Sequence, residues 1–297
     1  MKGLFISGGS TKFIALLSAV KELNEQDFRP DILAGVSSGA IVSLVYACDV
    51  MKEAINIGLN LSMDTIFSQC PFTSKGKITG SAIWNIIRGK TYLGKMGNLE
   101  KAIRSIVTKE KFESYQNNPE APHVIVLAVN ASNKTRKIWY LKQCKYELAI
   151  KAVMASSSIP LVCTPVEIDG QFYYDGGLRD HTPGNYVLER TKLGSMLTKV
   201  VTVFSRPEQL DDVPNNSWNR DILTVFNDLV MPTMNYEISK NDHFQEERLC
   251  VERKIMYRPV FIERFVEHLY DVNNERMKLG YRLGKKAVEK YYGFATN

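Results

Sequence analysis

The stretch PDILAGVSSGAIVSLVYAC, at residues 30–48, decides how this chain folds. It begins with a short apolar run, PDILA, of the kind found in buried strands of parallel sheets. The pentapeptide GVSSG at residues 35–39 follows as a tight turn, and an apolar run of helical length begins at Ser38. The sequence therefore predicts a strand, a turn and a helix, with Ser37 at the centre of the turn.

Ser37 has the position that nucleophilic catalysis requires. An attacking hydroxyl must project from the backbone, and a G-x-S-x-G turn between a strand and a helix provides that projection. Gly35 and Gly39 remove side chains that would crowd the turn. A serine that merely caps a helix is the alternative, but the flanking strand and helix favour a nucleophile.

A second strand, turn and helix precede this unit. Residues 2–7 form a short apolar run that ends at Gly8 and Gly9, and residues 11–25 carry apolar side chains at helical spacing. If the two strands are neighbours in a parallel sheet, they end at the same edge and their turns face each other. The backbone amides of Gly8, Gly9 and Ser10 are then candidate donors to an oxyanion.

Lys12 follows this glycine-rich turn. Its ammonium group is placed either beside the active site, where it would add positive charge, or on the solvent-facing side of a helix. The missing G-x-x-x-x-G-K-[ST] spacing excludes a P-loop.

The rest of the chain predicts one α/β domain over residues 1–297. Residues 50–120 are helix-rich and irregular, which is typical of an insertion or cap, and their apolar side chains are expected to line an acyl channel or to join the core. The candidates for that channel are Ile55, Ile57, Leu59, Leu61, Ile66 and Phe67. Further strands are expected at 123–130, 137–141 and 199–205, a helix at 146–156, and a hairpin around Asp169 and Gly170. From about residue 218 to 297 the pattern is mainly helical, with a long amphipathic helix expected at 263–292.

A serine nucleophile needs a base. The four histidines lie at His123, His181, His243 and His268, and only His181 follows a turn. Asp175, in YYDGG at residues 173–177, ends an aromatic strand and precedes Gly176 and Gly177, which permit a close approach of another backbone. Asp175 is therefore the better candidate for the base, and an ordinary turn aspartate is the alternative.

These motifs together resemble the patatin-like phospholipase family. The glycine-rich turn SGGSTK at residues 7–12, GVSSG at 35–39 and DGG at 175–177 stand in the family's order, and ASSSIP at 155–160 resembles the segment before its aspartate. The likeness covers about residues 1–205. It implies a three-layer α/β/α sandwich with a mostly parallel sheet, a helical insertion and a helical C-terminal tail.

The resemblance also implies a mechanism. Ser37 would be the nucleophile of a Ser–Asp dyad, Asp175 the general base, and the amides of residues 8–10 the oxyanion hole, with no metal or cofactor. The implied substrates are phospholipids or related acyl lipids, cleaved through an acyl-enzyme. Ser10 stands where the family usually has a third glycine, and Phe13 where it has another; a working oxyanion turn is expected at Ser10 unless its φ is positive.

Two other functions remain as alternatives. An α/β-hydrolase esterase with a Ser–Asp–His triad shares the serine turn, but such enzymes reach their nucleophile after several strands rather than two. A catalytically silent lipid-binding or interaction protein of the same fold is the second alternative.

Composition narrows the partners. The chain has a formal net charge of +6, with charges of both signs spread along it, and no motif for nucleic-acid binding accompanies this basic bias. No apolar stretch reaches the length of a transmembrane helix, and the start MKGLFISGG has the pattern of a strand rather than of a signal peptide. A cytoplasmic protein is expected, with contact to a membrane or micelle surface limited to peripheral binding.

Overall fold

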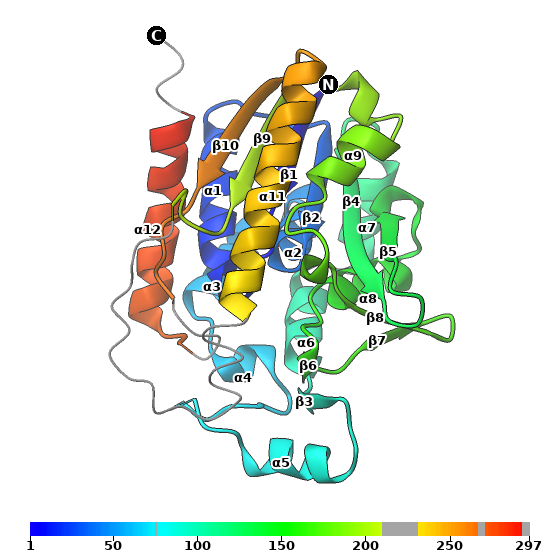
Figure 1. The fold of residues 1–297 in the computed structure, drawn as a ribbon, viewed down its shortest axis with the longest axis vertical. Coiled ribbons are helices and arrows are strands. Elements are labelled where there is room, and N and C mark those ends of the chain that lie inside the picture. The colour runs from blue at the N-terminus through cyan, green and yellow to red at the C-terminus, as the bar shows by residue number, and fades with distance from the viewer. Residues whose placement is uncertain (75, 210–230, 267–270, 293–297) are drawn as a thin grey trace.

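The computed structural model describes residues 1–74, 76–209, 231–266 and 271–292. A mostly parallel sheet lies between two layers of helices (Figure 1), which confirms the predicted three-layer α/β/α fold. The parallel strands, in spatial order, are β10 (Met256–Phe261), β9 (Lys199–Phe204), β1 (Lys2–Ile6), β2 (Ile32–Val36) and β4 (His123–Asn130). The antiparallel strands are β5 (Arg136–Tyr140), β7 (Val166–Ile168) and β8 (Gln171–Asp175).

The two faces of the sheet bury different apolar side chains, because successive residues of a strand point to opposite faces. On β1, Leu4 and Ile6 join the larger core while Phe5 joins the smaller one, and β4 alternates in the same way. Helices on the larger core are α1 (Phe13–Glu25), α2 (Ser38–Ala47), α8 (Tyr146–Ser156) and α12 (Asn274–Tyr291). Helices on the smaller core are α9 (Gly184–Arg190) and α11 (Met231–Glu252).

Strand β4 determines where the serine turn and the aspartate meet. Along one edge it pairs with β5 over residues 125–129, and this pairing overlaps the residues that pair with β2 and those that pair with β8. Because a strand has only two edges, β2 and β8 must share the other edge in succession. Strand β2 ends there with Val36 opposite Leu127, and β8, running the other way, ends with Asp175 opposite Ala128.

The helical insertion is also present. Its elements are α3 (Met51–Leu59), α4 (Met63–Ile66), α5 (Gly80–Ile87), β3 (Tyr92–Gly94), α6 (Gly97–Ile106) and α7 (Lys109–Asn117). The short strand β3 pairs with β6 (Leu161–Cys163) in a separate two-stranded sheet. This pairing connects the insertion to the segment that leads into the β7–β8 hairpin.

The expectation of a mainly helical C-terminal region is wrong at one point. Residues 256–261 form β10, which pairs in parallel with β9 at the edge of the sheet, and the expected helix at 263–292 begins only at Asn274. Pro259 is tolerated in β10 because an edge strand has one side that makes no ladder hydrogen bonds. Trp218, near which the mainly helical pattern is expected to begin, and His268 lie outside the described residues.

Helix α11 carries two buried carboxyl groups that face the smaller core. Asp242 accepts hydrogen bonds from the backbone N–H groups of His181 and Thr182, and Glu246 accepts one from the Thr202 hydroxyl at 2.7 Å. Burial, with the proximity of the two carboxyl groups, raises the pKa of Asp242 to about 8, and burial raises that of Glu246 to about 7. Both groups therefore bind protons more tightly in the folded chain than in the unfolded chain.

This difference makes stability depend on pH. A carboxyl group whose pKa is raised by folding stabilises the fold below its unfolded pKa near 4, and that contribution is lost as pH rises through the folded value. We therefore expect the melting temperature to fall between pH 5 and about 8. We expect Asp242→Asn to melt a few degrees above the parent at pH 8 and to lose this advantage at pH 5. Calorimetry at both values checks this, and an advantage independent of pH would contradict it.

Candidate active site

The backbone at Ser37 is held in a conformation that few residues adopt. Its φ and ψ are 56° and −126°, at the junction of β2 and α2. A β-carbon on Gly35 would lie 2.3 Å from the carbonyl oxygen of Gly39, and one on Gly39 would lie 2.3 Å from that of Ile6. Gly35 therefore allows the turn to close on itself, and Gly39 allows it to pack against β1. A strained backbone of this kind, at a cost of about 1 to 3 kcal/mol, is often found at functional sites.

Three consecutive serines at the end of α8 fix both halves of the site. Ser156 Oγ accepts a hydrogen bond from the Ser37 backbone N–H at 2.9 Å and donates one to the Leu127 carbonyl at 2.6 Å. Ser157 Oγ donates to the Ser37 carbonyl at 3.2 Å. The Ser158 carbonyl accepts from the Asp175 backbone N–H at 2.9 Å. One short segment thus connects the serine turn, β4 and the end of β8.

Asp175 is buried, and the Ser37 side chain lies close enough to its carboxylate to lower the pKa of that group. Gly177 N–H donates a further hydrogen bond to Asp175 Oδ1 at 2.7 Å. Burial raises the pKa of Asp175 to about 6, and the Ser37 side chain and the Gly177 N–H oppose that rise. A β-carbon on Gly176 would lie 2.5 Å from the Leu127 carbonyl oxygen, so the glycine permits the close backbone approach that the sequence predicts.

The glycine-rich turn after β1 lies against the serine turn, because β1 and β2 are neighbours. A β-carbon on Gly8 would be 3.2 Å from Ser37 Cβ. The Gly8 amide already donates to the His181 carbonyl at 3.0 Å, whereas the amides of Gly9 and Ser10 have no acceptor among the described residues. Of the three amides expected to form the oxyanion hole, those of Gly9 and Ser10 are therefore free to bind a ligand.

The peptide between Gly8 and Gly9 has a fixed orientation. The Gly8 carbonyl accepts hydrogen bonds from the hydroxyl groups of Ser7 and Ser205. Because C=O and N–H point in opposite directions across a trans peptide, the Gly9 N–H points away from Ser205. A working oxyanion turn is expected only if the φ of Ser10 is not positive. The φ of Ser10 is 49°, so that expectation is not met. A non-glycine residue in this region bears a strain of roughly 1 to 2 kcal/mol.

Lys12 supports this turn from outside the pocket. Its Nζ donates to the Ser205 carbonyl at 2.9 Å, and burial, with a smaller contribution from the charge of Arg264, lowers its pKa to about 8. The residues that line the pocket include Ser10 and Phe13 but not Lys12. Lys12 thus binds Ser205, which follows β9 and whose hydroxyl donates to the Gly8 carbonyl.

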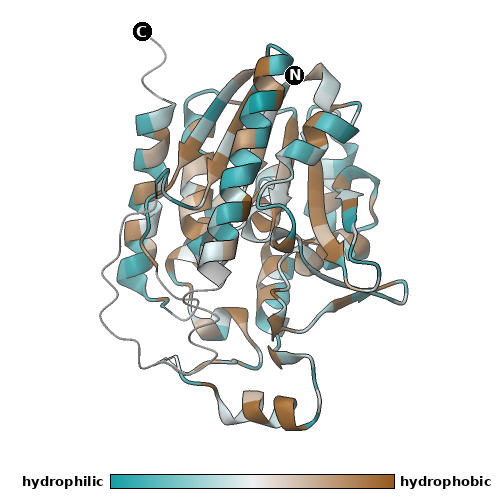
Figure 2. Ribbon diagram, viewed as in Figure 1, coloured by the Kyte–Doolittle hydropathy of each residue, from teal (hydrophilic) through white to brown (hydrophobic). Residues whose placement is uncertain are grey.

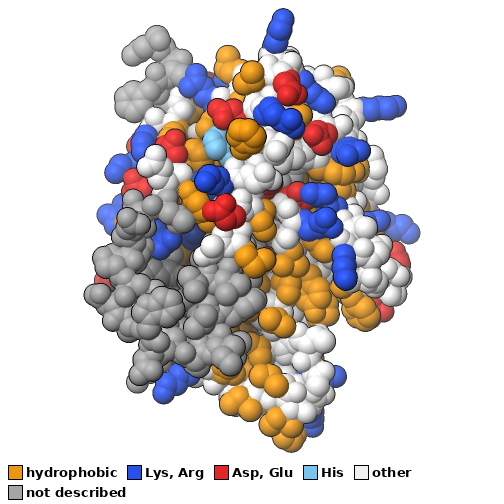
Figure 3. Space-filling model, in the orientation of Figure 1, with side chains coloured by type: hydrophobic (Ala, Val, Ile, Leu, Met, Phe, Trp, Pro, Cys, Tyr) orange, Lys and Arg blue, Asp and Glu red, His pale blue; other side chains and the backbone are white. Residues whose placement is uncertain are grey.

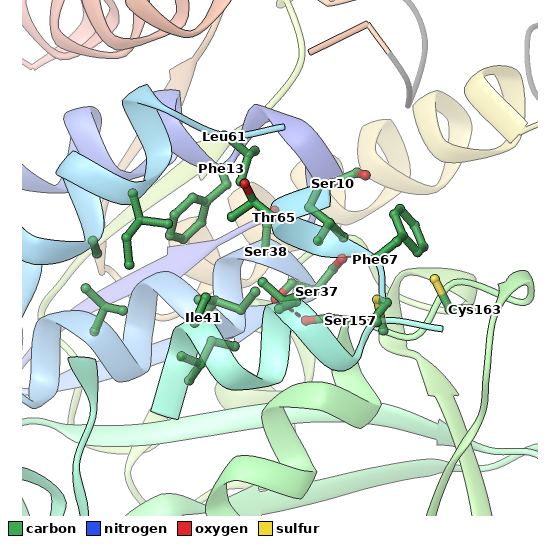
Figure 4. A pocket seen from close by; sticks show the side chains of 18 of the residues that line it. Ser10, Phe13, Ser37, Ser38, Ile41, Leu61, Thr65, Phe67, Ser157 and Cys163 are labelled. Atoms are coloured by element: carbon green, nitrogen blue, oxygen red, sulfur yellow. Dashed lines mark hydrogen bonds between the residues drawn. The ribbon is translucent and has the colours of Figure 1, made fainter. Parts of the chain in front are cut away.

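An apolar pocket of about 800 Å³, its open mouth included, begins at Ser37. Figure 4 shows Ser37, Ser38 and Ser157 together, with Phe13 and Ile41 on one side and Phe67 on the other. Of the six side chains expected along an acyl channel, four line the pocket: Ile57, Leu61, Ile66 and Phe67. Ile55 and Leu59 instead pack against the core.

One wall of the pocket was not foreseen. Helix α6 contributes Leu99, Ala102, Ile103 and Ile106, whose spacing of three, four and seven residues marks one face of a helix. That spacing is the signal that could have identified them. The Ser38 hydroxyl was also missed: it is buried, belongs to a residue that lines the pocket, and has no hydrogen-bond partner among the described residues.

None of the described histidines lines the pocket. Burial lowers the pKa of the His181 side chain to about 4, and the nearby Asn235 side chain opposes that shift. His243 Nδ1 lies 3.0 Å from the Tyr257 hydroxyl, and His123 opens β4 at the far end from Asp175. In the described part of the chain, no His, Cys, Asp and Glu side chains gather as a metal site, and no helix has both the length and the apolarity to cross a membrane.

The fold and the serine turn define an α/β protein with its serine in a strand–turn–helix elbow next to a strand-end aspartate. The chain belongs to the patatin-like phospholipase family, whose model matches residues 4–188. Membership of this family supports a lipid hydrolase.

Similar proteins were found by sequence and by structure. The "Probable lipid hydrolase 463L" of Invertebrate iridescent virus 6 is 23% identical over 220 residues, which cover 70% of this chain and 72% of that protein. The "Uncharacterized protein R571" of Acanthamoeba polyphaga mimivirus is 25% identical over 182 residues, 60% of this chain and 58% of that protein. VipD from Legionella pneumophila superimposes with a TM-score of 0.48 at 13% identity, over 98% of this chain and 67% of that one.

The serine segment after α8 can be tested directly. Ser156→Ala leaves the buried Ser37 amide without its acceptor, which costs about 1 to 3 kcal/mol. We expect kcat for a soluble p-nitrophenyl ester to fall about tenfold or more, because the serine turn loses its anchor to β4. Ser43→Ala is the matched control, since Ser43 Oγ bonds only the Gly39 carbonyl within α2. Equal activity of the two variants would show that the Ser156 contact does not position Ser37.

Proposed function

We propose that this chain is a lipid acyl hydrolase, of phospholipase A type or a related carboxylic ester hydrolase, with Ser37 as nucleophile and Asp175 as general base. The observation that carries the proposal is the placement of Ser37, in its strained elbow at the end of β2, next to the buried Asp175 carboxylate at the end of β8, beside an apolar pocket. A base of pKa about 6 is largely ionised at neutral pH yet basic enough to accept a hydroxyl proton during attack.

In the first half of the proposed reaction, Asp175 takes the proton of the Ser37 hydroxyl as Oγ attacks the ester carbonyl carbon. The carbonyl oxygen becomes negative, and the free amides of Gly9 and Ser10 are the proposed donors to it. Gly8, expected as a third donor, instead supports the turn through its bond to His181. The tetrahedral intermediate collapses, the proton passes from Asp175 to the leaving alcohol, and an acyl-enzyme is left.

In the second half, a water molecule takes the place of the alcohol. Asp175 removes a proton from this water as it attacks the acyl carbon, and the proton is returned to Ser37 Oγ when the ester bond to the enzyme breaks. The fatty acid leaves and the starting state is restored. The scheme assigns no step to a histidine, because Asp175 serves as the base; the described His243 side chain instead contacts the Tyr257 hydroxyl.

One observation favours the alternative of a catalytically silent lipid-binding protein of the same fold. The positive φ of Ser10 places strain in the turn that would hold the oxyanion, and glycine is the residue that adopts this conformation freely. A binding protein would keep the apolar pocket but would not need a reactive serine. The chemical reactivity of Ser37 therefore separates the two functions.

A fluorophosphonate probe tests this reactivity. We expect the folded protein to be labelled at Ser37, and expect labelling to be lost in Ser37→Ala and to fall at least about a hundredfold in Asp175→Asn. Because Asp175 must be ionised, kcat/KM should fall as pH drops through about 6. Replacement of His181 and His243 by Ala should leave the chemistry in place. An unlabelled protein with an unchanged melting curve would exclude the hydrolase.

The pocket predicts a preference for long acyl chains. Ala102→Trp fills the wall formed by α6, so we expect kcat/KM to fall at least about tenfold for a long-chain ester and to change little for an acetyl ester. Ala131→Trp, at an exposed turn, is the control. Comparison of p-nitrophenyl acetate with p-nitrophenyl palmitate in both variants gives the measurement. A uniform loss on both esters would argue that the pocket does not hold the acyl chain.

A further inference from the structure

Helix α5 has its apolar side chains on the outside. Ile83, Trp84, Ile86 and Ile87 are 48%, 52%, 51% and 67% exposed. The buried residues of this helix are Ala82 and Asn85, and the Asn85 side-chain amide donates to the Leu93 carbonyl at 3.1 Å. In an ordinary surface helix the large apolar residues face the core and the polar ones face water. The orientation of α5 is therefore the reverse of that pattern.

This orientation is built into the insertion. Thr79 Oγ1 accepts a hydrogen bond from the Ala82 N–H, which caps the helix, and the Thr79 N–H donates to the Pro71 carbonyl at 3.0 Å. Together with the bond from Asn85 to Leu93, these contacts fix which face of α5 turns inward. Large apolar side chains exposed together on a folded protein often mark an interaction site.

The charges around α5 all have one sign. Between Asp64 and Glu100 the sequence contains five basic residues and no acidic one, so this segment accounts for five of the six net positive charges. The five are Lys75, Lys77, Arg88, Lys90 and Lys95. Arg88 lies over the Trp84 ring, 4.8 Å from its centre, and Lys77 and Lys90 are exposed. Along this segment of the sequence, the apolar residues of α5 are thus flanked by basic residues alone.

The position of α5 connects it with the pocket. The chain enters the α5 loop just after Phe67 and leaves it just before Met96, and both residues line the pocket that begins at Ser37. Figures 1 and 2 show α5 at the end of the molecule farthest from the N-terminus, with its hydrophobic residues at the tip. In the space-filling view of Figure 3, apolar side chains gather at this same end.

We propose that the α5 surface, formed by Ile83, Trp84, Ile86 and Ile87 with Lys77, Arg88 and Lys90, docks on an anionic phospholipid membrane. The inference rests on the proposed function, in which the substrate is a lipid held in such a membrane. An interfacial membrane anchor has three features: apolar side chains that enter the boundary between headgroups and acyl chains, an aromatic ring at the same depth, and flanking cations. Anionic headgroups supply the charge that complements the five basic residues.

A binding experiment without catalysis tests this surface. In a Ser37→Ala background, the full chain is sedimented with vesicles of phosphatidylcholine and phosphatidylserine and with vesicles of phosphatidylcholine alone. We expect Ile86→Ser/Ile87→Ser to weaken binding to the mixed vesicles at least about tenfold. The matched control is Phe244→Ser/Val251→Ser on α11, whose parent side chains are 60% and 71% exposed. We expect this control to bind as the parent does, and binding to fall when phosphatidylserine is left out.

Insertion can be observed through Trp84. Lipids brominated in the acyl chain should quench part of the tryptophan fluorescence of the parent, and this part should be absent in Trp84→Phe. The docking surface is wrong if the α5 double variant binds mixed vesicles as tightly as the α11 control. It is also wrong if no vesicle binds and the double variant instead turns a dimer into a monomer, because a second copy of the chain would then cover α5.

The two proposals fail separately. A protein that binds vesicles through α5 but is never labelled at Ser37 keeps the docking surface and loses the hydrolase. A protein that cleaves soluble esters but shows no α5-dependent vesicle binding keeps the hydrolase and loses the docking surface.

Discussion

The single edge of β4 that β2 and β8 share is the constraint on which the candidate site depends. Backbone pairing fixes Val36 opposite Leu127 and Asp175 opposite Ala128, so two strands that arrive from opposite directions end next to each other. Side-chain interactions alone could not place a serine and an aspartate so reproducibly, because each strand end would otherwise be free to fray. The pairing of β2 and β8 with β4 thus holds Ser37 and Asp175 next to each other.

The shared edge also explains the electrostatics of the aspartate. The gap between the two strand ends is closed by Leu127, by the serines after α8 and by Gly176, which packs on the β4 backbone, so little water reaches the carboxylate. Burial disfavours its charged form, and the Ser37 side chain and the Gly177 N–H recover part of that loss. The geometry that brings the two strand ends together therefore also raises the pKa of Asp175 to about 6.

Sequence patterns predicted the features formed by residues close in the chain, but not those that depend on pairing between distant residues. The elbow, the glycine turn and the β7–β8 hairpin each depend on residues close in sequence, and each was predicted. Strand β10 was missed because its pairing with β9 joins positions more than fifty residues apart. The bond from Gly8 to the His181 carbonyl was missed for the same reason. Only the backbone conformation reveals the positive φ of Ser10, since a serine has no composition signal for it.

The insertion shows a further limit of periodicity. Apolar side chains of α4 and α6 turn into the pocket, whereas those of α5, which lies between them in the sequence, turn out to solvent. A pattern of apolar residues indicates which side chains leave water but not what they enter, because a protein core, an acyl chain and a membrane are alike in being apolar. The charges separate these cases. A helix that packs on the core has no need of flanking charges of one sign. The segment between Asp64 and Glu100, which contains α5, has five basic residues and no acidic one, and this favours a membrane over a protein core.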